Sequence, residues 1–435
     1  MRIFLLALAL LTSVTIGARR TLTLRQCVDY ALERNVDVKR QVLVRQGREL
    51  ALHTARHSRL PDLNAAGSQS FGFGRSLTAE NTYASRNTQS TSLSVSTSLP
   101  LFTGLRIPNQ VAQARLNLAA ATADLEHVRD DLSLRVAQYY LEALYQKAMW
   151  RVAEEQVELS QKQLARIEAF EQNQKASGVD VAQARSRVAQ DESSRVQAEN
   201  AYRLALLELS QLIEMPSPDS LDVTDPETLP PVAPAGSPEA IYAQAVALRP
   251  DVRADSLRIA SAERGVRIAR SAYWPTLSLG AGLGTSYYRT SGFDNFAFGR
   301  QLRDNFSKSV ALSLSIPIFN RFSTRNAVRQ AELDLQDSRW QLESTRKALY
   351  KEIQQAWYNA VAAQSKYVSS NVAVDEAKAA FELMAKKYEN GKANATEYDE
   401  SRTNRLHAEY DRLAARYEYL FRMKILDFYR GERLE

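Results

Sequence analysis

Apolar and small polar residues alternate along two stretches of the chain. Between residues 90 and 99, Leu, Val or Thr alternates with Ser, and residues 310–318 repeat the alternation with Val, Leu and Ile against mostly Ala and Ser. Weaker alternation precedes each stretch. Since successive side chains of a strand point to opposite faces, this period of two predicts β-strands. We therefore predict two strands within 62–101 and two within 276–318.

The second face of these predicted strands carries Ser, Gly and Ala, whereas the polar face of a soluble sheet usually carries Lys, Glu or Thr. Small residues suit the inside of a narrow closed sheet. Four strands cannot close a membrane barrel, because bacterial single-chain barrels have at least eight and a spanning sheet leaves no edge in hydrocarbon. We therefore expect several chains to share one barrel, with a soluble sheet packed on helices as the alternative.

Aromatic residues gather near both ends of the predicted strands, as in the interfacial girdles of outer-membrane barrels. They are Phe71, Phe73, Tyr83, Tyr287, Tyr288, Phe293, Phe296, Phe298 and Phe306 at one end, and Phe102, Trp274 and Phe319 at the other.

Each pair of predicted strands is followed by a long stretch of helical periodicity, over 105–171 and 321–389. At ~1.5 Å per residue, a helix of nearly seventy residues reaches about 100 Å, which a globule of this size cannot bury. Apolar residues recur every seven positions, as in a coiled-coil seam. In the second stretch they are Val328, Leu335, Leu342 and Leu349.

Both predicted long helices end at polar turns, residues 172–180 and 390–397. Gly391 follows an asparagine there and is a good helix stop, because glycine takes the left-handed conformation at low cost. Helical periodicity then returns over 181–213 and 398–430. Each turn is therefore predicted to be the tip of a helical hairpin.

The chain contains an internal repeat. Leu-Pro-Leu-Phe at 99–102 recurs as Ile-Pro-Ile-Phe at 316–319, a displacement of 217 residues. The same displacement relates the apolar positions of the two predicted long helices and carries Arg185 onto Arg402. The register survives over about 80 residues without a net insertion.

We predict structural repeats at 19–213 and 239–430, each opening with helices, over 22–60 in the first and 239–273 in the second. Between the repeats, 214–238 holds seven of the 13 prolines and is predicted to be an irregular connection. The fold class is mainly α, with long antiparallel coiled-coil hairpins and a membrane β-barrel part.

The first eighteen residues carry Arg2, an apolar run and small residues, the order of a secretory signal peptide at 1–18. The run is too short to span a bilayer, where ~20 residues are needed. A lipid anchor at Cys27 is an alternative, but no small residues precede it, which favours a buried structural thiol.

Composition narrows the chemistry. The chain has 435 residues, one Cys and four His, which excludes an intrachain disulfide and argues against a metal cluster. The 56 basic and 50 acidic residues alternate and build no basic face for nucleic acid. His53 and His57 lie four residues apart on a predicted helix, but no third metal ligand is visible. The glycines at 280–284 could be mistaken for a dinucleotide-binding loop, but the sequence after them does not continue as a helix. We predict no cofactor, no metal site and no catalytic residues.

At this point the chain resembles the TolC-like outer membrane efflux protein family along nearly all of its length. The carrying features are the repeat, the strand-to-helix swivels at Pro100 and Pro317, Leu-Thr-Leu at 22–24 before a helix with Asn35, and Tyr-Glu-Asn-Gly at 388–391. The resemblance implies a homotrimer with a twelve-stranded barrel in outer-membrane lipid and a long periplasmic extension. It implies a passive exit duct that works with a periplasmic adaptor and an inner-membrane transporter.

The resemblance also implies gate residues. Acidic positions six and nine residues after the second-tip glycine form pore-narrowing rings that favour cations, and here they are Glu397 and Glu400. Tyr388 matches the family's tyrosine, and Asp180 matches the acidic residue of the first tip. Ala393 stands where some members carry a locking arginine. The resemblance places adaptor contacts at the tips: Gln174, Lys175, Ser177, Gly178, Asn390, Gly391, Lys392 and Ala393.

Three alternatives stay open at this level. Carboxylates in the first turn of a helix, such as Glu397, are also explained by the helix dipole alone. The chain could be a periplasmic or surface coiled-coil protein without a pore, or an exported enzyme, although no acid–base constellation is visible. The cargo, drugs, metal ions or a polypeptide, is left open together with the identity of pump and adaptor.

Overall fold

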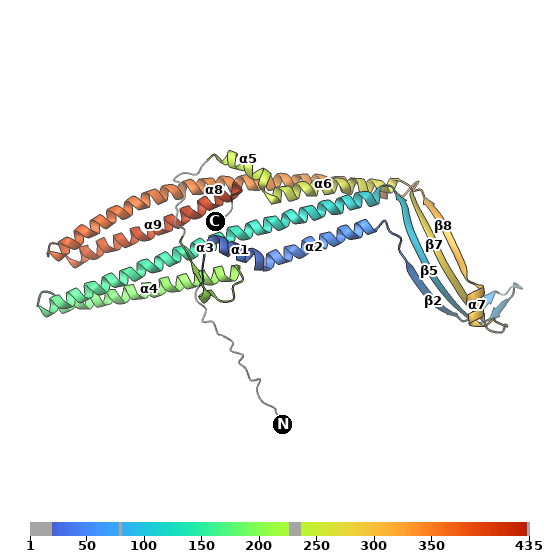
Figure 1. Cartoon of the computed structure of the whole chain (residues 1–435), viewed down its shortest axis with the longest axis horizontal. Coiled ribbons are helices and arrows are strands. Elements are labelled where there is room, and N and C mark those ends of the chain that lie inside the picture. The colour runs from blue at the N-terminus through green and yellow to red at the C-terminus, as the bar shows by residue number, and fades with distance from the viewer. Residues whose placement is uncertain (1–19, 78–80, 226–235, 433–435) are drawn as a thin grey trace, which may run out of the picture. The chain divides into compact units, whose positions relative to one another are not determined.

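The computed structural model describes residues 20–77, 81–225 and 236–432 (Figure 1). The predicted signal peptide lies outside the described residues. The chain divides into two compact units: one comprises Met1–Val42, Asp124–Val252 and Thr345–Glu435, and the other Leu43–Ala123 and Arg253–Ser344. Each unit draws on both halves of the sequence, so the compact units do not coincide with the predicted repeats.

The first unit contains two helical hairpins, which Figure 1 shows as pairs of neighbouring helices. Helix α3 (Arg106–Gln172) enters from the second unit and turns back as α4 (Gly178–Leu212), and α8 (Ser323–Glu389) turns back as α9 (Ala395–Tyr429). Both long helices have 67 residues, both return helices have 35, and each element lies 217 positions after its counterpart. The internal repeat is therefore present in the structure.

The core of the first unit surrounds helix α1 (Leu24–Arg34), which is followed by α2 (Val36–His57). Cys27 is fully buried against α3 and α4 residues such as Leu132 and Leu209. Burial raises the pKa of the Cys27 thiol to about 12. The interpretation as a buried structural thiol is confirmed.

The proline-rich connection is more regular than predicted. It contains a short 3-10 helix, Pro218–Ser220, and strand β6 (Leu221–Val223), which pairs in parallel with β1 (Arg20–Leu22). The expectation of an irregular 214–238 is wrong over this segment, because Leu221 and Val223 alternate with a polar residue and are buried. Helix α5 (Pro238–Leu248) begins at the last proline of the connection.

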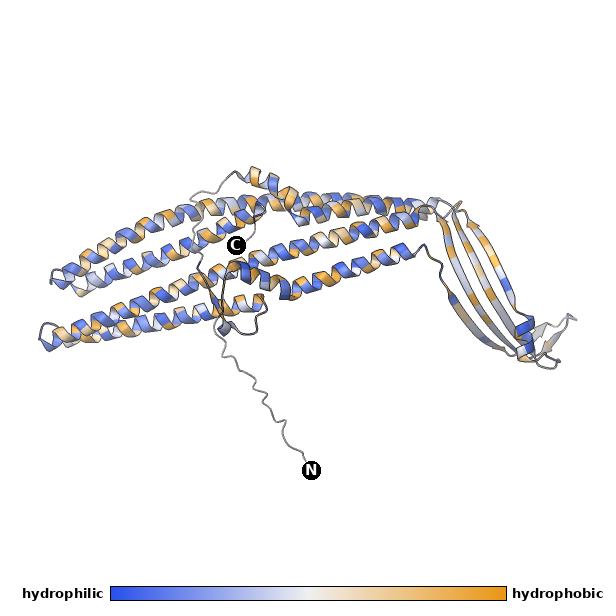
Figure 2. Cartoon of the chain, in the orientation of Figure 1, coloured by the Kyte–Doolittle hydropathy of each residue, from blue (hydrophilic) through white to orange (hydrophobic). Residues whose placement is uncertain are grey.

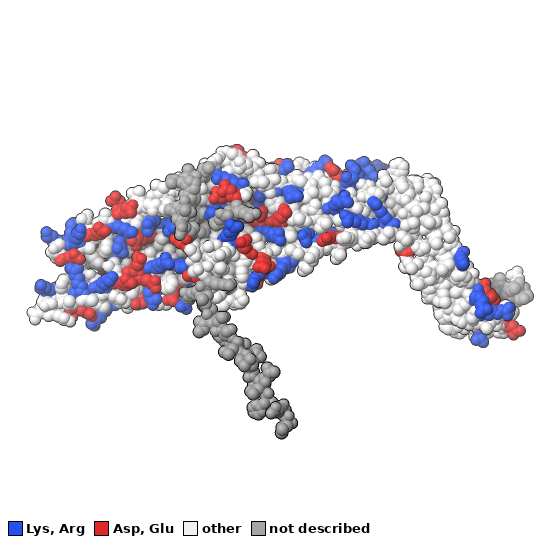
Figure 3. Space-filling model, viewed as in Figure 1, with Lys and Arg blue, Asp and Glu red and all other residues white. Residues whose placement is uncertain are grey.

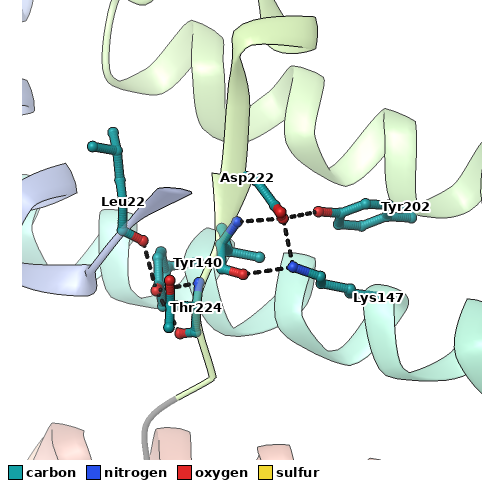
Figure 4. A network of polar contacts seen from close by, with 7 residues as sticks. Leu22, Tyr140, Lys147, Tyr202, Asp222 and Thr224 are labelled. Atoms are coloured by element: carbon teal, nitrogen blue, oxygen red, sulfur yellow. Dashed lines mark hydrogen bonds and ion pairs between the residues drawn. The ribbon is translucent and has the colours of Figure 1, made fainter. Parts of the chain in front are cut away.

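A polar network fastens β6 to the hairpin (Figure 4). Lys147 on α3 donates to Asp222 at 2.5 Å, and the Tyr202 hydroxyl of α4 donates to the same carboxylate oxygen at 2.7 Å. The Tyr140 hydroxyl lies 2.9 Å from the carbonyl oxygen of Leu22 and 2.8 Å from that of Thr224. Burial alone would raise the pKa of Asp222, but the hydrogen bonds from Lys147 and Tyr202 help to lower it overall.

The second unit contains a four-stranded antiparallel sheet in the order β2–β5–β7–β8. The prediction of four strands is confirmed. A small hairpin of β3 (Arg75–Leu77) and β4 (Tyr83–Ser85) and a helix, α7 (Phe298–Asp304), are additions. The sheet is preceded in each half by a helix, α2 or α6 (Pro250–Arg270), and its strands are β2 (Asn64–Gly72), β5 (Thr88–Thr103), β7 (Thr276–Thr290) and β8 (Ser307–Ser315).

Strand register brings the apolar residues onto one face of this sheet. Leu279 lies opposite Leu312, Leu277 opposite Leu314, and Val310 is 76% exposed. The other face is mostly Ser and Gly, as in the pairs that Gly280, Gly282 and Gly284 form with serines of β5. Figure 2 shows the apolar residues along these strands. Since helices do not cover Val310 and its neighbours on β8, the alternative of a sheet packed on helices is wrong.

The two outer strands, β2 and β8, each pair on one side only within the described chain. Every residue of both strands is exposed. Closing this sheet into a barrel requires further strands from other chains. Separately, no helix among the described residues is both long enough and apolar enough to cross a membrane.

The chain turns from strand to helix just beyond the predicted swivels. Pro100 lies inside β5 at a bulge, and the left-handed backbone is at Gly104 and Leu105, with φ of 59° and 65°. The counterpart turn is at Arg321 and Phe322, with φ of 55° and 63°. These four residues redirect the backbone, and the swivel role of the prolines stays a prediction.

Candidate functional site: the hairpin tips

The first tip, between α3 and α4, is a short turn closed by a helix cap. The Ser177 side chain accepts a hydrogen bond from the Asp180 N–H, and the Asp180 carboxylate accepts from the Ser177 N–H and hydroxyl, each at 2.8 Å. These hydrogen bonds hold the pKa of Asp180 below its usual value. The turn spans 173–177 and is shorter than the predicted 172–180, because this capping box starts α4 at Gly178.

The second tip repeats this chemistry. The Asn394 side chain accepts from the Glu397 N–H, and the Glu397 carboxylate accepts from the Asn394 N–H, both at 2.9 Å. Gly391 has a φ of 66°, in the left-handed region. The turn spans 390–394 and not 390–397, because α9 already begins at Ala395. Asp180 and Glu397 therefore both have a structural task as capping residues.

The predicted adaptor contacts lie in or beside these two turns. All are exposed except the half-buried Ala393: Gln174, Lys175, Ser177, Gly178, Asn390, Gly391 and Lys392. Glu400 is exposed on α9, three residues after Glu397, so both carboxylates lie on one side of the helix.

Tyr388 and Asp180 are brought together at a small cavity of about 60 Å³ between the two hairpins. The Tyr388 ring stacks on the Tyr398 ring with 4.9 Å between centroids. The centroids of the Tyr398 and Phe381 rings are 5.4 Å apart. Burial, followed by the nearby Asp180 carboxylate, raises the pKa of Tyr388. Two of the four predicted gate residues therefore share one site, while Glu397 and Glu400 are exposed and do not line it.

An ion pair that was not predicted from the sequence borders this cavity. Arg402 Nη1 on α9 lies 3.2 Å from Asp191 Oδ2 on α4, and their side chains are only 3% and 9% exposed. Arg187 Nε lies 3.6 Å from the other carboxylate oxygen. Burial raises the pKa of Asp191, against the influence of Ser160 and Arg187. The pair joins one hairpin to the other.

The repeat contained a partial signal for this pair. Arg185, the counterpart of Arg402 in the first hairpin, is 67% exposed and pairs with Glu168 of its own hairpin at 2.9 Å. Of these two counterparts, only Arg402 pairs with a carboxylate of the other hairpin. A second link between hairpins, Arg166 Nη1 to Glu389 Oε1 at 2.8 Å, lies nearer the tips and is more exposed.

A family model described as "Outer membrane efflux protein" matches residues 27–213 and 241–431. The chain belongs to this family. This efflux protein is 27% identical over 302 residues to the pyoverdine export outer membrane protein OpmQ of Pseudomonas putida, covering 69% of the chain and 61% of the relative. It is 27% identical over 379 residues to the cation efflux system protein CusC of Escherichia coli O157:H7, covering 83% and 77%.

The fold of this efflux protein matches solved members. A crystal structure of CusC superposes with a TM-score of 0.77 at 20% identity, covering 94% of this chain and 92% of that one. Membership places the protein in the outer membrane with an extension into the periplasm, and the family's members are not enzymes. The two alternatives, a coiled-coil protein without a pore and an exported enzyme, are therefore wrong.

Family members form trimers and function with adaptors and inner-membrane transporters. Among the described residues, no three His, Cys, Asp or Glu side chains are grouped to hold a metal ion. His53 and His57 lie on one face of α2 with ring centroids 6.3 Å apart. Basic and acidic residues are interspersed along the face of the helices that Figure 3 shows.

Proposed function

We propose that this efflux protein is a passive homotrimeric exit duct that spans the outer membrane and the periplasm. Three chains each donate strands β2, β5, β7 and β8 to a twelve-stranded barrel. The observation that carries this proposal is the sheet with one exposed apolar face, one Ser/Gly/Ala face and two unpaired edges. The apolar face contacts lipid, the Ser/Gly/Ala face lines a water-filled lumen, and the unpaired edges pair with strands of neighbouring copies.

The periplasmic end of the duct is gated at the hairpin tips. In the closed trimer, Glu397 and Glu400 of three chains face the axis, and like charges so placed attract cations. Asp180 and Tyr388 hold the two tips against each other across their shared cavity. Because Ala393 offers no charge, the buried Arg402–Asp191 pair takes over the task of holding the hairpins together.

An adaptor docks on the exposed tip turns and an inner-membrane transporter supplies the energy. The turn residues Gln174, Lys175, Asn390 and Lys392 present amides and ammonium groups to such a partner. Docking opens the duct by separating α4 from α9, which breaks the Arg402–Asp191 contact. The names of the relatives include pyoverdine export and cation efflux, so the duct itself is expected to accept more than one class of cargo.

Reconstitution of the purified full chain into planar bilayers tests this function. We expect discrete conductance steps of low open probability and a reversal potential in a salt gradient that indicates cation preference. The ring variant Glu397→Gln with Glu400→Gln should weaken that cation preference. Gln174→Ala with Asn390→Ala serves as its matched control, because these turn residues lie outside the proposed rings. A protein that inserts but never conducts, even when the Arg402–Asp191 contact is removed by substitution, would rule out the duct.

A further inference from the structure

Helix α7 lies on the apolar face of the sheet, at the strand ends away from α3. The Thr285 hydroxyl donates to the Leu302 carbonyl at 2.6 Å, and the Tyr287 and Phe298 rings are 4.9 Å apart. Thr285 and Tyr287 continue the alternation of Leu283, so they belong to its face. Tyr287 is thereby buried and does not lie in the exposed aromatic girdle that its position predicts.

Side-chain hydrogen bonds fix α7 where β8 is too short to pair with β7. The Gln301 amide accepts from the Tyr288 N–H and donates to its carbonyl, each at 3.0 Å. Asn305 Nδ2 donates to the Ser286 carbonyl at 2.7 Å. The helix is therefore held against the strand in the way a neighbouring strand would be.

Three basic side chains surround this helix. Arg300 and Arg303 are exposed on α7, and Lys308 lies opposite Leu283 on the apolar face of the sheet. Figure 3 shows basic residues beside acidic ones at this end of the sheet, and Arg300 Nε lies 3.4 Å from the Asp304 carboxylate. The Arg300 guanidinium lies 4.3 Å from the Phe296 ring centroid and the Lys308 ammonium 5.7 Å from that of Phe306.

A lysine on a lipid-facing surface is costly at the bilayer centre and nearly free at the interface. Lys308 therefore marks the level of the lipid headgroups. Over residues 284–309, four basic residues face two acidic ones, so this level is positively charged. Positive charge beside aromatic rings is the composition that holds anionic headgroups.

An apolar hollow opens on the same face directly beside Thr285. Its volume is about 470 Å³. It is lined by Ala65, Gly67, Leu93, Val95, Leu283 and Phe306. The hollow is shallow and open to the outside, and its lining contains no charged residue.

We propose that the α7 rim binds a phosphate-bearing anionic lipid of the outer leaflet. Its acyl chain fills the apolar hollow, and its phosphate groups lie on Arg300, Arg303 and Lys308. The assignment rests on the proposed function, because the apolar face must contact the bilayer and the α7 end of the sheet must lie at its outer leaflet. Charge complementarity favours a phosphorylated lipid over a zwitterionic one, because each basic side chain near an anionic lipid contributes about fivefold in binding.

Native mass spectrometry of the detergent-solubilised full chain tests this site, with diphosphoryl lipid A as the probe and phosphatidylcholine as the neutral reference. The variant R300Q/R303Q/K308Q should bind lipid A roughly 100-fold more weakly, as expected for three lost charges at about fivefold each. The matched control R40Q/R48Q/K162Q removes three exposed charges from α2 and α3 and should bind as the wild type does.

Equal lipid A binding by the rim variant and the wild type would overturn the proposal, as would equal weakening in the control. Phosphatidylcholine bound as tightly as lipid A, or displacement of lipid A by inorganic phosphate alone, would also overturn it. Conductance in phosphatidylcholine bilayers separates this inference from the proposed function. A wild-type protein that conducts but ignores lipid A refutes only the rim site, whereas one that never conducts refutes the duct.

Discussion

Replacing Arg402 by methionine tests how the two hairpins are held together. The substitution keeps most of the side-chain volume but leaves Asp191 buried without its closest cation, 3.2 Å away. Removing one partner of a buried ion pair costs about 3–5 kcal/mol. We expect the lower end, near 3 kcal/mol, because Arg187 still lies 3.6 Å from the carboxylate.

If opening separates these hairpins, a loss of about 3 kcal/mol from the closed state shifts the closed-to-open ratio by roughly 150-fold. Single-channel recording should therefore show R402M open far more often than the wild type. Thermal unfolding of the solubilised protein should show a parallel loss of stability. The double variant R402M/D191L should recover most of that stability, since an apolar pair of similar volume often replaces a buried ion pair without loss.

Arg185 provides the matched control, because the repeat places it at the same position of the first hairpin. Its ion pair with Glu168 is mostly exposed and stays within one hairpin, so R185M should cost less than about 1 kcal/mol. R402M and R185M proteins that unfold and conduct alike would show that the Arg402–Asp191 pair does not hold the hairpins together.

Further substitutions test the remaining structural assignments. D222N should lower the melting temperature at neutral pH; since the pKa of Asp222 is lowered in the fold, the wild type should lose the same stability only as the pH falls below about 4. The double variant E397Q/E400Q should weaken cation selectivity without unfolding the tip, because Gln also serves a capping box; an unchanged reversal potential would contradict the ring assignment. G104A should be destabilising by at least about 2 kcal/mol by calorimetry, because its φ is 59° and a Cβ would meet backbone at 2.6 Å, whereas G391A, with open space around it, should cost about 1 kcal/mol.

The regular part of this fold could be predicted from local periodicity. Period-two alternation over 310–315 and the heptads of the second long helix are properties of neighbouring residues, so they need no knowledge of packing. Because the two halves are related by a displacement of 217 residues, the sequence predicts the same hairpin in each half. Strand β6 escaped prediction because three residues are too short for a period, and its burial depends on pairing with Arg20–Leu22 from the other end of the repeat.

The position of the candidate site at the hairpin tips could be predicted from the sequence, but the contacts between the two hairpins could not. The polar turns at 173–177 and 390–394 stop helices by local chemistry, so the tips were visible in the sequence. The contact of Arg402 with Asp191 joins residues 211 positions apart and depends on how two hairpins pack. Nothing local distinguishes Arg402 from Arg185, which occupies the equivalent position and stays exposed.

Intermolecular cross-linking of the sheet edges tests the shared barrel most directly. Within one chain, β2 and β8 are the outer strands of four, about 14 Å apart, which is too far for a disulfide. In a C27S background, one cysteine at Ser68 in β2 combined with one scanned along Ser309, Ala311 and Ser313 in β8 should therefore link only different chains. We predict a covalent product of three chains for at least one register; monomers at every register would contradict the account.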